Sequence, residues 1–175
     1  MLQFIEFVAH ALDTVNEETQ ASLDGMTVEQ LLHRPGPASN NMAWLAWHIG
    51  RTQDERSSFL TGREQLWIAD GWHMRFGLPP DPENTGRGHS DADVAAVRPE
   101  SVEAASAYCA AAYKRASAYI RSLNTGDEET LVSHPEGGES KLIDILDRMV
   151  HGGYAHVGQL MYVRGLIEQR HWFSR

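Results

Sequence analysis

Two histidines near the C-terminal end of the chain have residue types and a spacing that could serve a metal ion. His151 and His156 lie in VHGGYAHVGQLMYVRGL, residues 150–166, on either side of Gly152 and Gly153. Neutral imidazole is a ligand of zinc, nickel and iron. On a regular α-helix, however, side chains five residues apart point about 140° away from each other. The spacing therefore leaves two interpretations open, a pair of metal ligands or two unrelated core residues.

A third histidine, His48, lies in the strongly apolar segment MAWLAWHIG, close to Trp44 and Trp47. An imidazole buried there without a partner would cost free energy. Its partner could be a backbone carbonyl group, the hydroxyl group of Tyr154, or a metal ion shared with His156. The six other histidines are weaker candidates, because they fall on expected exposed faces, in loops or at the C-terminus. They are His10, His33, His73, His89, His134 and His171, of which His73 in the loop segment GWHMRFGLPP is the strongest.

The elements that must position these histidines are helices. Four segments have the apolar period of long amphipathic helices, namely residues 2–23, 40–62, 99–124 and 140–169. Asn40 and Gly62 are the expected caps of the second helix, and Thr27 and Gln30 have the spacing of a capping box in a short helical turn. Residues 63–99 contain most of the prolines and are too irregular for a long helix.

The pattern predicts an all-α fold, a four-helix bundle with a long crossover loop between helices two and three. No signal of a β-hairpin or an internal repeat is found. The chain has 175 residues, of which 42% are hydrophobic, enough for one core. We therefore expect a single domain over residues 1–175.

Charge and composition exclude several partners. The net charge is −9 and no basic run is long enough to follow a phosphate backbone, so nucleic acid is not an expected partner. No stretch reaches the roughly 18 apolar residues of a membrane span, and the N-terminus does not resemble a secretion signal, so we expect a cytoplasmic protein without a membrane partner. Cys109 is the single cysteine, which excludes an internal disulfide and favours a small buried apolar residue.

Three segments resemble the DinB-like family of metalloenzymes. They are NNMAWLAWHIGRTQDE in the second long helix, LWIADGWHMRFGLPPD in the loop and HVGQLMYVRGL in the last helix, together roughly half the chain. The resemblance implies a divalent metal, commonly zinc or nickel, held by one histidine of helix two and an H-x-x-x-H pair on the last helix. Relatives include thiol S-transferases and a mycothiol-dependent isomerase.

Carried over residue by residue, the resemblance assigns His48 and His156 as ligands, but its remaining histidine has no counterpart. Gly152 stands four residues before His156, and His151 is one position further back. A π-bulge at Gly152 and Gly153 would realign residues five apart, and such bulges favour functional sites. We therefore predict a metal site of His48, His151 and His156 on a bulged helix. Two alternatives are a site of two histidines completed by water or a carboxylate, and no metal site. On a regular helix, the two glycines would simply let a neighbouring helix approach and His151 would point elsewhere.

Three other positions match the family pattern. Asp54 lies six residues after His48 and so on a different face, where it would support the site or anchor the loop, or else be a solvated carboxylate. Gln159 and Arg164 could support the site or brace the bundle. The tryptophans of helix two and the loop are expected in the core and in pocket walls.

The resemblance implies a divalent-metal-dependent enzyme that acts on a small molecule, as a thiol S-transferase or hydrolase, with a low-molecular-weight thiol as a candidate cofactor. The alternative is a non-catalytic metal-binding or ligand-binding bundle that acts through dimerisation. A site that opens to a pocket walled by residues 64–90 would favour the enzyme. A homodimer is expected in either case, because relatives are often dimers and aromatic residues remain at helix ends and in the terminal HWFSR.

Overall fold

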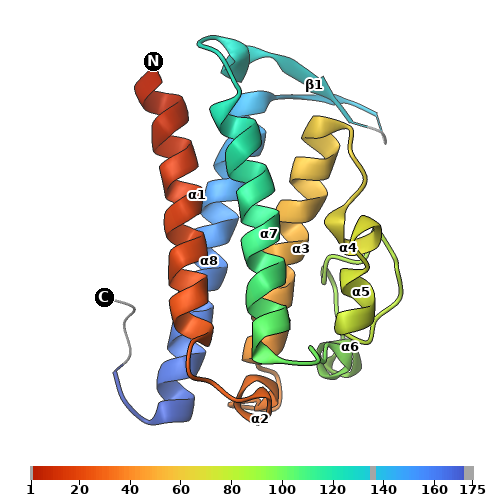
Figure 1. The fold of residues 1–175 in the computed structure, drawn as a ribbon, viewed down its shortest axis with the longest axis vertical. Helices are drawn as coiled ribbons and strands as arrows, with labels where there is room; N and C mark the ends of the chain where they lie inside the picture. The colour runs from red at the N-terminus through yellow and green to blue at the C-terminus, as the bar shows by residue number, and fades with distance from the viewer. Residues whose placement is uncertain (1, 135–136, 172–175) are drawn as a thin grey trace.

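A computed structural model describes residues 2–134 and 137–171 and shows a bundle of four long helices (Figure 1). The long helices are α1 (Leu2–Leu23), α3 (Met42–Thr61), α7 (Val102–Arg121) and α8 (Leu142–Glu168). The short elements are α2 (Val28–Leu32), α4 (Leu66–Ala69), α5 (Trp72–Arg75), α6 (Asp91–Ala96), η1 (Asp127–Glu129), β1 (Leu131–Ser133) and β2 (Glu139–Lys141). The predicted all-α four-helix bundle is confirmed.

The directions of the helices explain the long crossover. Helices α1 and α3 each pack against both α7 and α8. In Figure 1, α1 and α8 run in one direction, whereas α3 and α7 both run in the other. Because consecutive long helices α3 and α7 are parallel, the chain must return along the whole bundle between them. That return contains α4, α5 and α6, which lie beside α3 on the side away from α1.

Local capping sets where the helices begin and end. The predicted capping box of α2 is present, because the Thr27 side chain accepts from Gln30 N and the Gln30 side chain accepts from Thr27 N. The N-cap of α3 is Asn41 and not Asn40, since Asn41 Oδ1 accepts from Trp44 N at 2.8 Å. Gly62 ends α3 in the left-handed conformation, with φ of 65°.

The expectation of no β-hairpin was wrong. Strands β1 and β2 pair antiparallel, with Val132 opposite Ser140, and connect η1 to α8. Each strand has three residues, too few for a recognisable apolar alternation. The turn depends on Gly137 and Gly138, whose φ angles are 96° and 89°. The hairpin lies at the C-terminal end of α3, where His134 stacks on Phe59 with ring centroids 5.3 Å apart.

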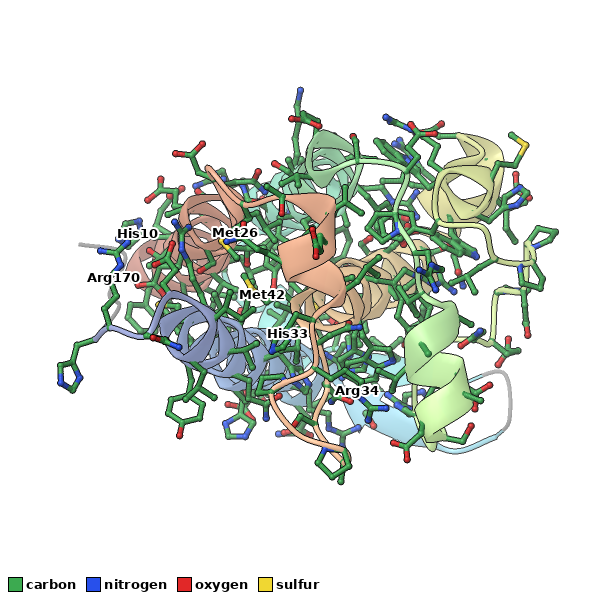
Figure 2. The ribbon with its side chains drawn as sticks, turned by 90° about the horizontal axis from the view of Figure 1, so that it is seen from below. His10, Met26, His33, Arg34, Met42 and Arg170 are labelled. Carbon is green, nitrogen blue, oxygen red and sulfur yellow. The ribbon has the colours of Figure 1, made fainter. Side chains whose placement is uncertain are left out.

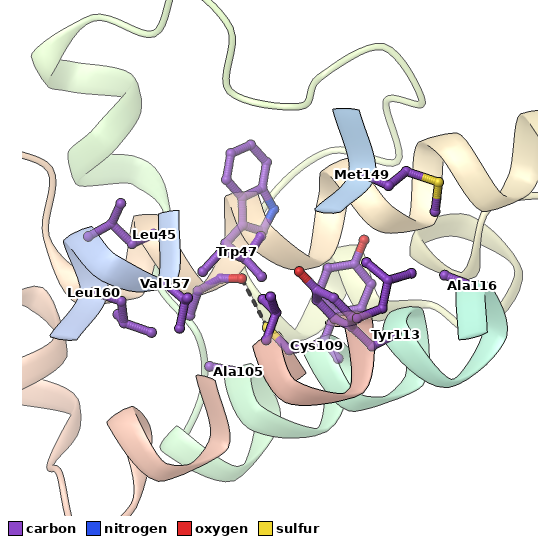
Figure 3. Close-up of a cluster of buried hydrophobic side chains, with 14 of the residues drawn as sticks. Leu45, Trp47, Ala105, Cys109, Tyr113, Ala116, Met149, Val157 and Leu160 are labelled. Atoms are coloured by element: carbon purple, nitrogen blue, oxygen red, sulfur yellow. Dashed lines mark hydrogen bonds between the residues drawn. The ribbon is translucent and has the colours of Figure 1, made fainter. Parts of the chain in front are cut away.

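The core lies between the four long helices and includes side chains of α3, α7 and α8 (Figure 3). Cys109 is fully buried there and its Sγ donates to the carbonyl group of Ala46 at 3.0 Å. Burial raises the pKa of the thiol to about 12, so Cys109 behaves as the small buried residue that the sequence predicts.

Two further features close the bundle. Gly50 allows α3 and α7 to approach, because a Cβ atom there would lie 2.8 Å from the Tyr108 ring. Helix α2 covers one end of the bundle, close to the buried Met26 and Met42 (Figure 2).

Within the described residues, no helix is both long and apolar enough to cross a membrane.

Candidate functional site

His48 is held in a fixed orientation on the first turns of α3. The side chain is buried, and its ring stacks on Trp44 with centroids 4.7 Å apart and planes inclined by 12°. Its Nδ1 lies 2.5 Å from the carbonyl oxygen of Thr85, which can only accept. Nδ1 must therefore carry the proton, and the neutral ring leaves Nε2 with a free lone pair.

The loop that supplies this carbonyl group can approach α3 because residue 86 is glycine. Gly86 has φ of 95°, and a Cβ atom there would lie 2.9 Å from both Trp44 and Trp47 and 3.1 Å from His48 Nδ1. A side chain would meet two buried indole rings. The crossover thus orients the histidine through a backbone carbonyl group, in the way that outer hydrogen bonds orient metal-binding histidines.

His156 faces His48 from α8. The two Nε2 atoms are 3.1 Å apart, with the rings inclined by 86°. His156 Nδ1 lies 3.3 Å from Oε1 of Gln159, one turn further along the helix, and donates to it. Gln159 therefore contacts the site, and the structure brings His48 and His156 together.

Both imidazoles are neutral at physiological pH. Burial lowers the pKa of His48 to about 4, against a hydrogen bond to Thr85 that raises it, and nearby positive charges lower it further. The pKa of His156 is also lowered, first by burial, while Gln159 opposes and Arg56 reinforces the shift. Neutral imidazole is the form that binds a metal ion.

The predicted bulge in the last helix was wrong, and the structure does not bring His151 to the other two histidines. Helix α8 is an uninterrupted α-helix from Leu142 to Glu168, so the five-residue spacing carries His151 round to an exposed position. Of the two glycines, Gly153 serves packing instead. A Cβ atom at Gly153 would lie 3.0 Å from the Tyr113 hydroxyl group and 3.2 Å from Val15 Cγ1, so this glycine admits α1 and α7.

Arg56 occupies the space beside Gly152, where the resemblance would place a third histidine. A Cβ atom at Gly152 would lie 3.6 Å from Arg56 Nη1, and this guanidinium donates to the carbonyl group of Arg148 at 3.0 Å. The third corner of the site therefore holds a cation that comes from α3.

Asp54 anchors the crossover, as one of the two interpretations predicts. It is fully buried and accepts from the backbone N–H groups of Leu66 and Trp67, at 2.9 and 2.8 Å, at the start of α4. It also accepts from the Tyr108 hydroxyl group at 3.1 Å. Arg51, buried next to it at 3.7 Å, donates to the carbonyl group of Pro82 in the same crossover.

Arg164, in contrast, braces the bundle. It is buried, donates to the carbonyl group of Ala21 at 2.7 Å and pairs with Glu168 at 3.1 Å, which ties α8 to the end of α1.

His89 has more contacts in the site than its expected loop position predicts. Its Nδ1 accepts from Trp44 Nε1 at 3.0 Å, its Nε2 lies 2.8 Å from Asn84 Oδ1, and its ring stacks on Trp47. Through Trp44 it supports the ring of His48. Its position within the glycine-containing segment NTGRGHS, residues 84–90, is the signal that the sequence offers. Among the other histidines, His10, His33 and His171 are exposed, as expected.

The two imidazoles fit a shared divalent cation in donor type and spacing. Metal–nitrogen bonds of about 2.0–2.1 Å place two ligand nitrogens about 2.9 Å apart at a right angle and about 3.3 Å apart in a tetrahedron. The observed 3.1 Å lies between these values. Within residues 2–134 and 137–171, no group of three or more His, Cys, Asp or Glu side chains could hold a metal ion. The protein itself thus offers two donors here.

Comparison with known proteins gives the family. A family model described as the DinB superfamily matches residues 11–160. A crystal structure of a conserved protein from Enterococcus faecalis aligns with a TM-score of 0.83 at 23% identity, over 94% of this chain and 97% of that one, and shows the same fold. No curated protein matches the sequence. Since the family model spans most of the chain, the protein belongs to the DinB superfamily.

Proposed function

We propose that the protein binds one divalent metal ion, zinc or nickel, through Nε2 of His48 and Nε2 of His156, and acts as a transferase or hydrolase on a small molecule. The observation that carries the proposal is the facing pair of imidazole nitrogens, 3.1 Å apart. Membership of a superfamily whose members often bind divalent metals supports it.

The positions of the ring protons favour a cation between His48 and His156. His48 Nδ1 and His156 Nδ1 each face an oxygen acceptor, so each ring places its one proton there. Each Nε2 atom then carries a lone pair, and the two atoms are 3.1 Å apart with no proton between them. A third proton between them would make one ring an imidazolium ion, which the lowered pKa of each ring disfavours. A divalent cation satisfies both lone pairs at once.

The chain would leave most of the coordination sphere open, as catalytic sites do and closed structural sites do not. When bound, the ion would supply Lewis acidity to water or to the thiol group of a small cofactor or substrate. Thr85 and Gln159 would hold the two rings in the required tautomer. Because Arg56 is a nearby cation, we expect weaker metal binding than at a three-histidine site.

A non-catalytic metal-binding or ligand-binding bundle is the second candidate, favoured by the lack of a third donor among the described residues. A measurement of catalytic turnover distinguishes the enzyme from the binding protein. Metal-loaded protein that hydrolyses or thiolates no member of a panel of small esters, amides and electrophiles, with and without low-molecular-weight thiols, would favour the binding protein.

The first test is metal content. Purified protein, and protein titrated with Zn²⁺ or Co²⁺, should bind about one equivalent of metal, and His48→Ala or His156→Ala should reduce binding at least tenfold. The exposed His33→Ala is the control. His151→Ala should also retain metal, because that ring points away from the pair. Near-stoichiometric metal in either His48→Ala or His156→Ala would refute the proposal, and loss of metal in His151→Ala would restore the predicted three-histidine site.

A variant designed to bind metal more tightly provides a second test. Gly152→His places an imidazole four residues before His156. Its Cβ atom has room, because it would lie 3.6 Å from Arg56 Nη1, an ordinary contact distance. Combined with Arg56→Ala, it should raise the affinity for Zn²⁺ at least tenfold. Unchanged affinity would argue that the pair at His48 and His156 is not a metal site.

Homodimerisation stays a prediction, and the exposed face of α8 is the surface that we propose for it. Tyr162 and Leu166 are 70% and 46% exposed there, next to the partly buried Met161. The terminal aromatic residues Trp172 and Phe173 lie outside the described residues. Light scattering should give twice the monomer mass, and Tyr162→Glu with Leu166→Glu should give the monomer. A wild-type monomer at all micromolar concentrations would refute the prediction.

A further inference from the structure

A cavity of about 770 Å³ lies between the C-terminal half of α3, the start of α8, the crossover and the hairpin residue His134. Its volume is in the range of sites for small molecules. Four arginines line it, Arg56, Arg63, Arg87 and Arg148, against two glutamates, Glu55 and Glu83. The chain as a whole has a net charge of −9, so this concentration of positive charge is a local feature of the cavity.

The four arginines also differ from most others in their partners. In the described part of the chain, seven arginines lie within ion-pair distance of a carboxylate. None of the four cavity arginines does so among those residues. Among the described residues, Arg56 has one guanidinium hydrogen bond, to the carbonyl group of Arg148, although it is partly buried. A guanidinium has five N–H donors, so most of the hydrogen-bonding capacity of Arg56 is left for a ligand.

The cavity arginines act on one another as like charges. The pKa of Arg56 is lowered, first by burial and then by Arg87 and Arg148, with Glu55 acting in the opposite direction. Partly buried like charges cost free energy unless something compensates them. An anion between the guanidinium groups would remove that cost, and the planar arginine fork matches phosphate and carboxylate oxygens.

We propose that this cavity binds a small organic dianion, carrying a phosphate group or two carboxylate groups, through the guanidinium groups of Arg56, Arg87 and Arg148. Arg56 links the cavity to the imidazole pair, because its Nη1 lies next to Gly152, one turn before His156. Arg56 would thus be the cavity residue nearest the two imidazoles along this path. The reaction that such a ligand would undergo depends on the proposed metal-dependent function. Binding of the anion itself requires only the arginines.

The test is calorimetric titration of the full chain, freed of metal with a chelator, at constant ionic strength. Inorganic phosphate and succinate are the dianion probes, and acetate is the monoanion control. One of the two dianions should bind at one site, and acetate should bind at least about tenfold more weakly, because it forms fewer charge-assisted hydrogen bonds. Preference for phosphate over succinate, or the reverse, identifies which group the cavity recognises.

Matched variants locate the site. Arg148→Gln removes an exposed cavity arginine and should weaken binding at least about tenfold, and Arg56→Gln should do the same while its amide keeps a donor for the Arg148 carbonyl group. Arg98→Gln removes the same charge from an exposed position outside the cavity and should leave binding unchanged. The inference is overturned if neither dianion binds, or if Arg148→Gln binds as well as Arg98→Gln. Because no metal is present, these outcomes are independent of those for His48 and His156.

Discussion

Two sets of buried or partly buried polar side chains on and against α3 differ in how completely the protein satisfies them. On the side of the crossover, both oxygens of Asp54 accept hydrogen bonds, from two backbone N–H groups and the Tyr108 hydroxyl group. Arg51 donates to three backbone carbonyl groups and to the side chain of Gln65. This set has its partners within the fold, which is the condition for a buried ionic network to be stable.

On the side of α8, the second set has groups that the fold leaves without complementary partners. His48 and His156 bring two Nε2 lone pairs within 3.1 Å of each other, and Arg56, next to Gly152, has no carboxylate at ion-pair distance among the described residues. The first set fixes the shape of the molecule. The second has donors and lone pairs for a ligand, which is why we propose that the function lies on the face of α3 that meets α8.

The largest expected effect tests the structural set. Asp54→Ala removes the carboxylate and leaves Arg51 and two backbone N–H groups buried without it, which should cost about 3–5 kcal/mol in the free energy of unfolding. His156→Ala in metal-free protein should cost less than about 1 kcal/mol, since it removes one of the two neighbouring Nε2 lone pairs. Urea denaturation measures both, with the exposed Asp147→Ala as control. Equal losses in Asp54→Ala and His156→Ala would contradict the comparison.

An intermediate effect should appear as pH dependence. The pKa of His48 is 6.5 when unfolded and about 4 when folded. Between these values the unfolded chain binds the extra proton, so this contribution to stability is complete above pH 6.5 and is lost as the pH falls toward 4. The loss should reach up to about 3 kcal/mol in metal-free protein. The measurement is the urea midpoint from pH 7 to 4.5, for the wild type and for His48→Gln. The difference between the two proteins isolates the contribution of His48 from that of the carboxylates. A difference that stays constant with pH would count against a buried neutral His48.

The smallest effect compares two adjacent glycines, one facing each environment. Gly153→Ala inserts a Cβ atom against Tyr113 and Val15 and should destabilise the fold by about 1–2 kcal/mol. Gly152→Ala meets only Arg56 at an ordinary contact distance and should stabilise α8 by up to about 1 kcal/mol. Thermal unfolding of the two variants tests the assignment. Stabilisation by Gly153→Ala, or destabilisation by Gly152→Ala, would reverse the assignment of which glycine faces the core.

Much of the fold could be predicted because helix periodicity and capping are local. The apolar period located the four long helices, and Thr27, Gln30 and Gly62 marked helix ends through hydrogen bonds within a few residues. His48 stood out because an imidazole in an apolar helical turn needs a partner. The hairpin was missed since its three-residue strands carry too little pattern.

The amino-acid sequence by itself determined that a buried His48 on the second long helix needs a partner, and that His151 and His156 cannot share an ion on a regular helix. Only the tertiary structure decided the rest. The partner of His48 Nδ1 is a backbone carbonyl group 37 residues away, which no side-chain pattern records. The packing of α1 and α7 against α8 decides whether α8 bulges or stays regular, with Gly153 allowing the close approach of these two helices. The placement of Arg56 beside Gly152 likewise arises from the contact of α3 with α8, because long-range packing and not local propensity sets which side chains meet.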